Sequence, residues 1–144
     1  MQTPTISKPP RVFLDTHVVT LFTFLENPDE FIPEGESEAY FMITMPVVRE
    51  LERIKDEHFS KGQRSRAKKC LDLLEAASPQ DGFPMSDRSS LHFYWQEPSE
   101  GSLRYGGQST PRSPDDHFIA AVYQSVLHYT NRPYKVFVLS DDIG

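Results

Sequence analysis

Residues 136–144 read VFVLSDDIG, a run of four apolar residues that leads into Ser140 and two adjacent aspartates. A short apolar run bounded by polar residues is typical of a buried β-strand. The segment RVFLD at 11–15 has the same form and places Asp15 directly after its apolar residues. Both predicted strands therefore bring carboxylates to their carboxyl ends.

The rest of the chain alternates strand and helix patterns, which is typical of an α/β fold with a mainly parallel sheet. Ligands of such sheets bind outside the carboxyl ends of the strands, at the point where the strand order reverses. We therefore expect Asp15, Asp141 and Asp142 to reach the same rim. The further predicted strands are 39–44 (AYFMIT) and 90–97 (SLHFYWQE), and the predicted helices are 16–27, 46–57, 62–78 and 114–130.

The length and composition predict one soluble domain at 11–144, after a disordered leader at 1–10 and with a long loop region at 78–114. No apolar stretch approaches the roughly 20 residues that span a bilayer, so no membrane association is expected. A single cysteine excludes an internal disulfide and a cysteine-based metal cluster, and a cytoplasmic location fits best. The net charge of −6 argues against a general attraction to nucleic acid, although a local basic patch remains compatible with it.

Two more acidic positions lie at the boundaries of predicted helices. In the helix at 46–57, Glu50 and Glu52 flank opposite edges of the apolar face, and the helical spacing does not choose between them. The ordinary alternative is that either glutamate is a solvent-exposed residue at the flank of the helix, without a functional role. In the helix at 114–130, Asp116 occupies the third helical position, where it resembles the acid of a capping box. Capping of the helix would explain Asp116 without a role in catalysis.

The spread of these acids over strand ends and helix edges would allow them to converge on one cleft. Crowded carboxylates repel one another strongly unless a cation is present. Oxygen-rich clusters suit Mg²⁺ or Mn²⁺ rather than zinc. Two such ions about 4 Å apart can activate water and stabilise the leaving oxygen in phosphodiester hydrolysis. The pattern is therefore compatible with a divalent-metal site that could serve such a reaction.

The chain also resembles the PIN-domain ribonucleases, specifically the type found beside PhoH-like ATPases and in nonsense-mediated-decay endonucleases. The similar stretches occur in the order of the family and cover most of the chain outside the leader and the 78–114 region. They are VFLDTHVV, MPVVRELERIKDEHFSKGQRSRAKKCLDLL, DDHFIAAV and VFVLSDDIG.

The resemblance implies a PIN-like three-layer α/β fold and a nuclease that uses Mg²⁺ or Mn²⁺. It favours Glu50 over Glu52, because the family's glutamate is followed by leucine. The implied catalytic and metal-binding acids are Asp15, Glu50, Asp116 and Asp142, with Asp115 and Asp141 as neighbouring metal ligands and Thr16, His17 and Ser140 as supporting residues.

The chain departs from the family pattern in three places. His17 stands where the family usually has asparagine, and its imidazole is expected to replace that hydrogen bond while altering the geometry of the metal site. The motifs leave the long loop at 78–114 unexplained. The family's closing helix and last short strand do not follow the final acidic motif, so the expected fold has a truncated C-terminal unit. The strand edge that this unit would cover could then pair with a second copy in a homodimer.

Five cations between residues 61 and 69, with no acid among them, form a candidate contact for a phosphate backbone. A solvated helix face is the ordinary alternative. Tyr94, Trp95 and Tyr105 are candidates for base stacking, although core packing explains most aromatic residues. The five cations are Lys61, Arg64, Arg66, Lys68 and Lys69.

Two function classes follow from these observations. The first is an endoribonuclease that hydrolyses single-stranded RNA with metal-activated water and leaves a 5′-phosphate. The alternative is a catalytically weak PIN-fold module that binds RNA or a protein partner, such as an inhibitory, antitoxin-like protein.

Overall fold

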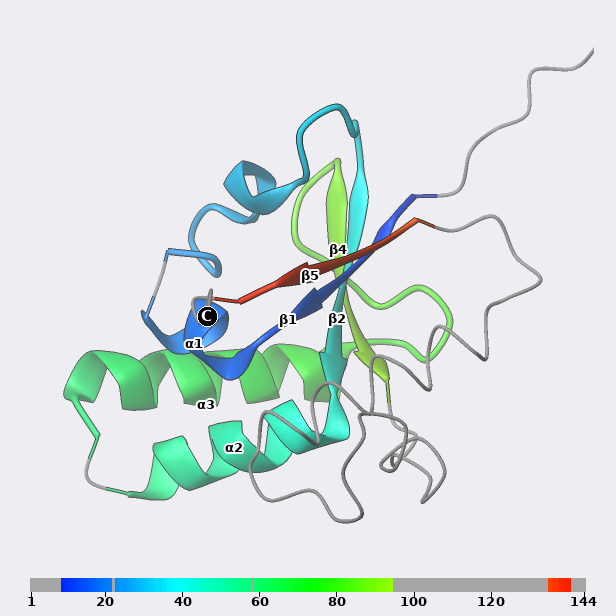
Figure 1. Ribbon diagram of the computed structural model, residues 1–144. Coiled ribbons are helices and arrows are strands. Elements are labelled where there is room, and N and C mark those ends of the chain that lie inside the picture. Colours follow the sequence, from blue (N-terminus) through cyan, green and yellow to red (C-terminus); the bar gives the residue numbers. More distant parts are fainter. Residues whose placement is uncertain (1–8, 22, 58, 95–134, 141–144) are drawn as a thin grey trace, which may run out of the picture.

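The structure is a computed structural model that describes residues 9–21, 23–57, 59–94 and 135–140. Its strands form one sheet in the order β3-β4-β2-β1-β5 (Figure 1). Every described pairing is parallel except that of β3 with β4, which confirms the predicted α/β class with a mainly parallel sheet. The strands are β1 (Arg11–Leu14), β2 (Ala39–Thr44), β3 (Phe83–Pro84), β4 (Ser89–Tyr94) and β5 (Val136–Leu139).

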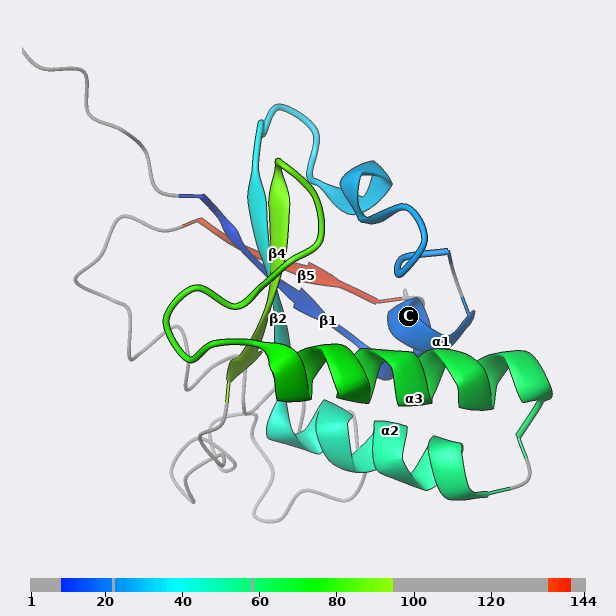
Figure 2. The same ribbon diagram turned by 180° about the vertical axis from the view of Figure 1, so that it is seen from behind.

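The described helices gather on one side of this sheet, as Figures 1 and 2 both show. Helices α2 (Met45–Asp56) and α3 (Lys61–Ala76) lie side by side, and α1 (Thr16–Leu21) packs against α3. A short 3₁₀ helix spans Pro28–Phe31. In the described part of the chain, no helix is both long enough and apolar enough to cross a bilayer. The predicted helix at 114–130 lies outside the described residues.

Helix α1 is shorter than its predicted range of 16–27, because it ends at Leu21. Residues 18–20 are all β-branched, and such residues favour helices only weakly. Beyond the helix, the Phe24 ring packs edge-on against Phe41, with ring centroids 4.8 Å apart. The prediction for the second half of this helix is therefore wrong. The chain leaves the helix before Phe24, whose ring packs into the core against Phe41.

The region predicted as a long loop begins with a hairpin. Ser78 and Gly82 form an antiparallel bridge, and the chain then enters β3, which the sequence pattern did not predict. Gly82 has a φ of +69°, and a Cβ atom there would lie 2.6 Å from the carbonyl oxygen of Leu91. Glycine thus permits both the turn and its close approach to β4. The remainder of this region, 95–114, lies outside the described residues, as does the leader at 1–8.

The main core lies between the sheet and the helices. Strand alternation points Val12, Leu14 and Phe41 toward α2 and α3, and all three are fully buried. Burial raises the pKa of the Cys70 thiol to about 12. The single cysteine therefore acts as a small apolar core residue rather than as a nucleophile. The helices contribute Val47, Leu51 and Ile54 from α2 and Ala67 and Cys70 from α3.

The opposite face of the sheet carries a stack of polar rings near the amino ends of the strands. The Arg11 guanidinium lies 4.3 Å from the centre of the Tyr40 ring, which lies 4.5 Å from the His92 ring. The Ser90 hydroxyl and His92 Nε2 are 2.7 Å apart. Burial lowers the pKa of His92 to about 4, with a smaller contribution from Arg11. His92 is therefore neutral at physiological pH, and its role in this stack is structural.

Candidate functional site

The candidate site lies where the order of the strands reverses. Strands β2 and β4 extend the sheet on one side of β1, whereas β5 lies on its other side. Register pairs Leu14 with Leu139, so β1 and β5 end at the same level. The carboxyl ends of parallel strands at such a reversal are the usual ligand-binding position of an open α/β sheet. Asp15 and Ser140, the next residues on each strand, both lie there.

Asp15 is held in one orientation by three hydrogen bonds. Its backbone N–H donates to the carbonyl oxygen of Leu139 at 3.0 Å, which extends the pairing of β1 and β5. The Thr16 N–H donates to Oδ1 at 2.7 Å, and the Ser140 hydroxyl donates to Oδ2 at 3.0 Å. The residue is 8% exposed. The ends of the first and last strands meet as predicted, whereas Asp141 and Asp142, the predicted companions of Asp15, lie outside the described residues.

The geometry of Asp15 fits a cation ligand. A carboxylate offers about four lone-pair positions. The Thr16 N–H occupies one position on Oδ1, and the Ser140 hydroxyl occupies one on Oδ2. Each oxygen therefore keeps an acceptor position for a metal ion or water. Oxygen donors of this kind are those that Mg²⁺ and Mn²⁺ prefer.

Thr44 adds a buried hydroxyl at the end of β2. The residue is fully buried, and its Oγ1 has no hydrogen-bond partner among the described residues. Register pairs Thr44 with Tyr94 on β4. The sequence pattern did not single out Thr44, because only acids and their neighbours were candidates for the site. A usable signal was present, since Thr44 follows the apolar run of its strand just as Asp15 follows RVFL.

Glu50 lies on α2, and its side chain is 20% exposed. On a helix it lies about 200° around the axis from Val48, whereas Glu52 lies only about 40° from it. Val48 and Glu52 face α3 together, where both line a groove. The two glutamates that the helical spacing left equivalent therefore lie on different flanks of α2, with Glu50 on the flank away from α3.

Both carboxylate oxygens of Glu50 are engaged by Arg53. The Arg53 Nη2 lies 2.5 Å from Oε1, and its Nε donates to Oε2 at 3.2 Å. Arg53 also bonds Glu57 at 2.9 Å and lies over the Phe59 ring at 4.9 Å. The hydrogen bond to Glu50 raises the pKa of Arg53 above its usual range. The Arg53 cation thus compensates the charge of Glu50, while each Glu50 oxygen keeps an acceptor position, as on Asp15.

The structure describes only some of the other predicted site residues. His17 is exposed on the first turn of α1. In the described ranges, no group of three His, Cys, Asp or Glu side chains is placed to hold a metal ion. Four predicted ligands lie outside those ranges, as do Trp95 and Tyr105. These ligands are Asp115, Asp116, Asp141 and Asp142.

The five cations of α3 do not form one uniform surface. Lys61, Lys68 and Lys69 are exposed, as expected for contacts to a backbone. Arg66 instead donates to the carbonyl oxygen of Thr20 at 3.0 Å, and its Nε lies 3.8 Å from Glu26. Arg64 donates to the carbonyl oxygen of Phe59. The two arginines are half-buried and join neighbouring segments, so of the five cations the three lysines remain exposed for contacts to a backbone.

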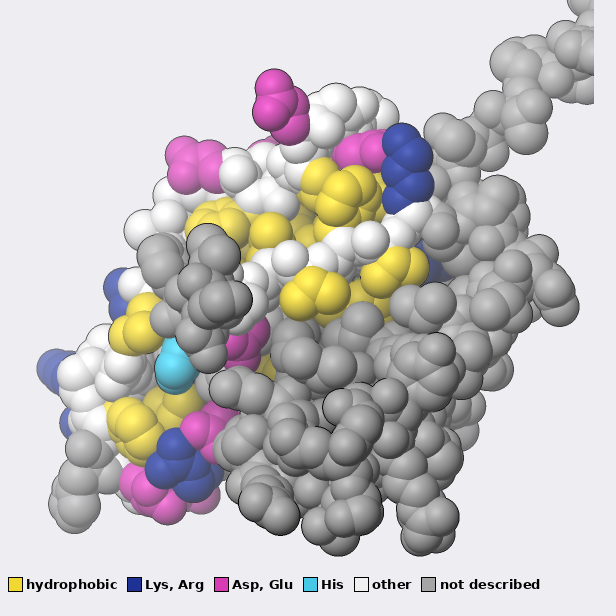
Figure 3. Space-filling view, in the orientation of Figure 1, with side chains coloured by type: hydrophobic (Ala, Val, Ile, Leu, Met, Phe, Trp, Pro, Cys, Tyr) yellow, Lys and Arg dark blue, Asp and Glu magenta, His cyan; other side chains and the backbone are white. Residues whose placement is uncertain are grey.

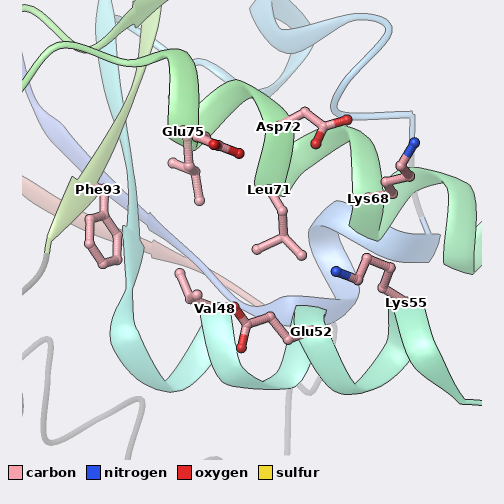
Figure 4. A pocket seen from close by; sticks show the side chains of 9 residues that line it. Val48, Glu52, Lys55, Lys68, Leu71, Asp72, Glu75 and Phe93 are labelled. Atoms are coloured by element: carbon pink, nitrogen blue, oxygen red, sulfur yellow. The ribbon is translucent and has the colours of Figure 1, made fainter.

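A groove of about 440 Å³ lies between α2 and α3, and Asp15 is not among its lining residues (Figure 4). Phe93 lies at one end, Val48 and Leu71 lie in the middle, and Lys55 and Lys68 lie at the other end. Three acids, Glu52, Asp72 and Glu75, line its sides. No ion pair joins these five charged side chains to any described residue.

The face of the molecule shown in Figure 3 carries acidic side chains close to a histidine and to basic side chains. Tyr94 is buried, which supports core packing over base stacking for this ring.

Comparison of the sequence with models of protein families and with curated proteins gave no match. The inference of function therefore depends on the site and on the four sequence motifs.

Proposed function

We propose that this chain is a PIN-like, Mg²⁺- or Mn²⁺-dependent endoribonuclease acting on single-stranded RNA. The observation that carries the proposal is the buried Asp15 carboxylate, oriented by Thr16 and Ser140 at the point where the strand order reverses. The sequence continues from Ser140 directly into two further aspartates. This combination supports an acid-rich site at the position where open α/β sheets bind ligands.

Asp15, Asp116 and Asp142 would hold the metal ions, with Glu50 as a fourth acid that Arg53 orients. When bound, such ions supply an activated water and stabilisation of the leaving oxygen. The chain's own contribution at Asp15 is orientation. The Thr16 N–H and the Ser140 hydroxyl fix the plane of its carboxylate. The exposed lysines of α3, Lys61 and Lys69, would attract the RNA backbone.

The direct test is incubation of the purified chain with end-labelled single-stranded RNA in Mn²⁺, with a matched reaction in chelator. We expect cleavage in Mn²⁺ alone and products that carry a 5′-phosphate. Cleavage that persists in chelator would contradict the proposal. Cleavage that is absent with both Mn²⁺ and Mg²⁺ would favour a binding module over an enzyme.

Mn²⁺ is also expected to raise the melting temperature of the RNA-free protein. Ligand that binds only the native state stabilises it by about 2.7 kcal/mol at 100 times its Kd. For a domain of this size we expect a shift of about 5–10 °C. Thermal unfolding followed by circular dichroism would measure it, with Na⁺ at equal ionic strength as the control. A melting curve that stays unchanged in millimolar Mn²⁺ would count against a preformed site.

A second candidate function is binding of a protein partner through the groove between α2 and α3. The groove favours an amphipathic helical segment, because it lies between two helices and has an apolar middle flanked by charged side chains. The charged side chains of the groove, which form no ion pair with a described residue, define the orientation of that segment. An acidic residue of the partner would lie beside Lys55 and Lys68, and basic residues would flank Glu52 and Glu75.

A synthetic amphipathic peptide with this charge order provides the test. Reversal of two charges, Lys55→Glu with Lys68→Glu, is expected to weaken its binding by at least about tenfold, because like charges then meet. Fluorescence anisotropy would measure the affinity, and Lys61→Glu, outside the groove, is the matched control. A peptide with a basic residue in place of the acid should regain affinity for the double variant. Equal affinities of all the variants for the first peptide would exclude the groove as its binding site.

A further inference from the structure

The Thr44 hydroxyl is a polar group that the described part of the fold does not use. Thr44 is fully buried, and its Oγ1 lacks a hydrogen-bond partner among the described residues. A buried hydroxyl that has lost its hydrogen bonds to water destabilises the folded state. Valine has nearly the same shape and would avoid that penalty. A ligand that binds after folding would account for a threonine at this position.

The beginning of α2 does not use this hydroxyl. Thr44 is the N-cap residue of α2, and its φ of −91° and ψ of 165° are those of an extended cap. Threonine at that position usually accepts a hydrogen bond from the second or third N–H of the helix. Thr44 makes no such bond to α2, all of which is described. In contrast, Ser60 at the N-cap of α3 accepts from the Gln63 N–H at 3.2 Å.

The register of the sheet places Thr44 beside Asp15. Phe13 pairs with Met42, and continuation of this register by two residues sets Asp15 opposite Thr44. Register partners on parallel strands share a face, and neighbouring strands lie about 4.8 Å apart. Ser140 already bonds Asp15 from the other side. The ends of β5, β1 and β2 thus place a hydroxyl, a carboxylate and a second hydroxyl in one row.

We propose that the Thr44 hydroxyl is a further contact of the Asp15 site and binds the divalent cation or a water molecule of its hydration shell. This inference rests on the proposed function. A hydroxyl oxygen is a suitable hard donor for Mg²⁺ or Mn²⁺, and Mg²⁺ usually keeps several of its waters when bound. The hydroxyl destabilises the metal-free protein and stabilises the bound form.

The test is a titration of thermal stability with Mn²⁺, without RNA. Thr44→Val should melt at or above the wild-type temperature in chelator, because the unpartnered hydroxyl is gone. Its Mn²⁺ midpoint, which is the dissociation constant fitted to the rise of the melting temperature with Mn²⁺ concentration, should increase about three- to tenfold, the value of one lost hydrogen bond. Thr44→Ser retains the hydroxyl and should keep the wild-type midpoint, even if the lost methyl group lowers the melting temperature.

Thr20→Val is the matched control. Thr20 is also fully buried, but its hydroxyl donates to the Thr16 carbonyl oxygen at 3.1 Å. This variant should leave the Mn²⁺ midpoint unchanged. A wild-type shift together with an unchanged midpoint in Thr44→Val would overturn the role of Thr44 and leave the metal site intact. A wild-type protein that does not respond to Mn²⁺ would overturn this inference together with the proposed function.

Discussion

Replacement of Asp15 by asparagine is expected to reduce Mn²⁺-dependent RNA cleavage to the level seen in chelator, while the fold persists. The asparagine side chain would keep a carbonyl oxygen that can accept from either Thr16 or Ser140, so the junction of β1 and β5 should hold. The substitution removes the negative charge that attracts the cation. Cleavage of labelled single-stranded RNA measures the effect, and circular dichroism checks the fold.

Asp56→Asn is the matched control for this substitution. Asp56 is an exposed aspartate at the end of α2, so the change removes the same charge away from the site. We expect its cleavage rate to equal that of the wild type. Wild-type cleavage by the Asp15→Asn variant would show that Asp15 is not a metal ligand. Equal loss in both variants would point to total charge rather than to a particular site.

The strands that define the site were predictable because each is a short apolar run that ends in a polar residue. Segments 11–14, 39–44 and 136–139 each lie inside a predicted strand. Their parallel pairing followed from the helices between them. The two-residue β3 was not predictable in this way. It contains a proline, and its pairing depends on the conformation of Gly82 rather than on a repeating pattern.

The candidate site was predictable only for residues that directly follow a strand, because the pairing of the strands then determines where these residues lie. Asp15 and Ser140 follow apolar strands, and parallel pairing of those strands brings them together. Engagement of Glu50 by Arg53 was not predicted, although the spacing of three residues on a helix permits such a pair. Its geometry depends on rotamers that the sequence does not determine. Thr44 was missed because its importance lies in the lack of a partner among the described residues, which a sequence pattern does not reveal.

The two aspartates that follow Ser140 should differ in their effect on cleavage. Extended backbone turns successive side chains to opposite faces of a sheet. Ser140 directs its hydroxyl to Asp15, so continued alternation would turn Asp141 away from that side and Asp142 toward it. The resemblance to PIN-domain ribonucleases also assigns the acidic position to Asp142.

We therefore expect Asp142→Asn to lower Mn²⁺-dependent cleavage by orders of magnitude, as loss of a ligand from a two-metal site would. Asp141→Asn removes the same charge one residue earlier and is the matched control, with a milder effect through local electrostatics. Both variants would be assayed on the same labelled RNA across a Mn²⁺ titration, since loss of a ligand should also raise the Mn²⁺ concentration needed for activity. Equal losses in the two variants would show that the alternation stops at Ser140. Full activity in both would remove the segment after β5 from the site.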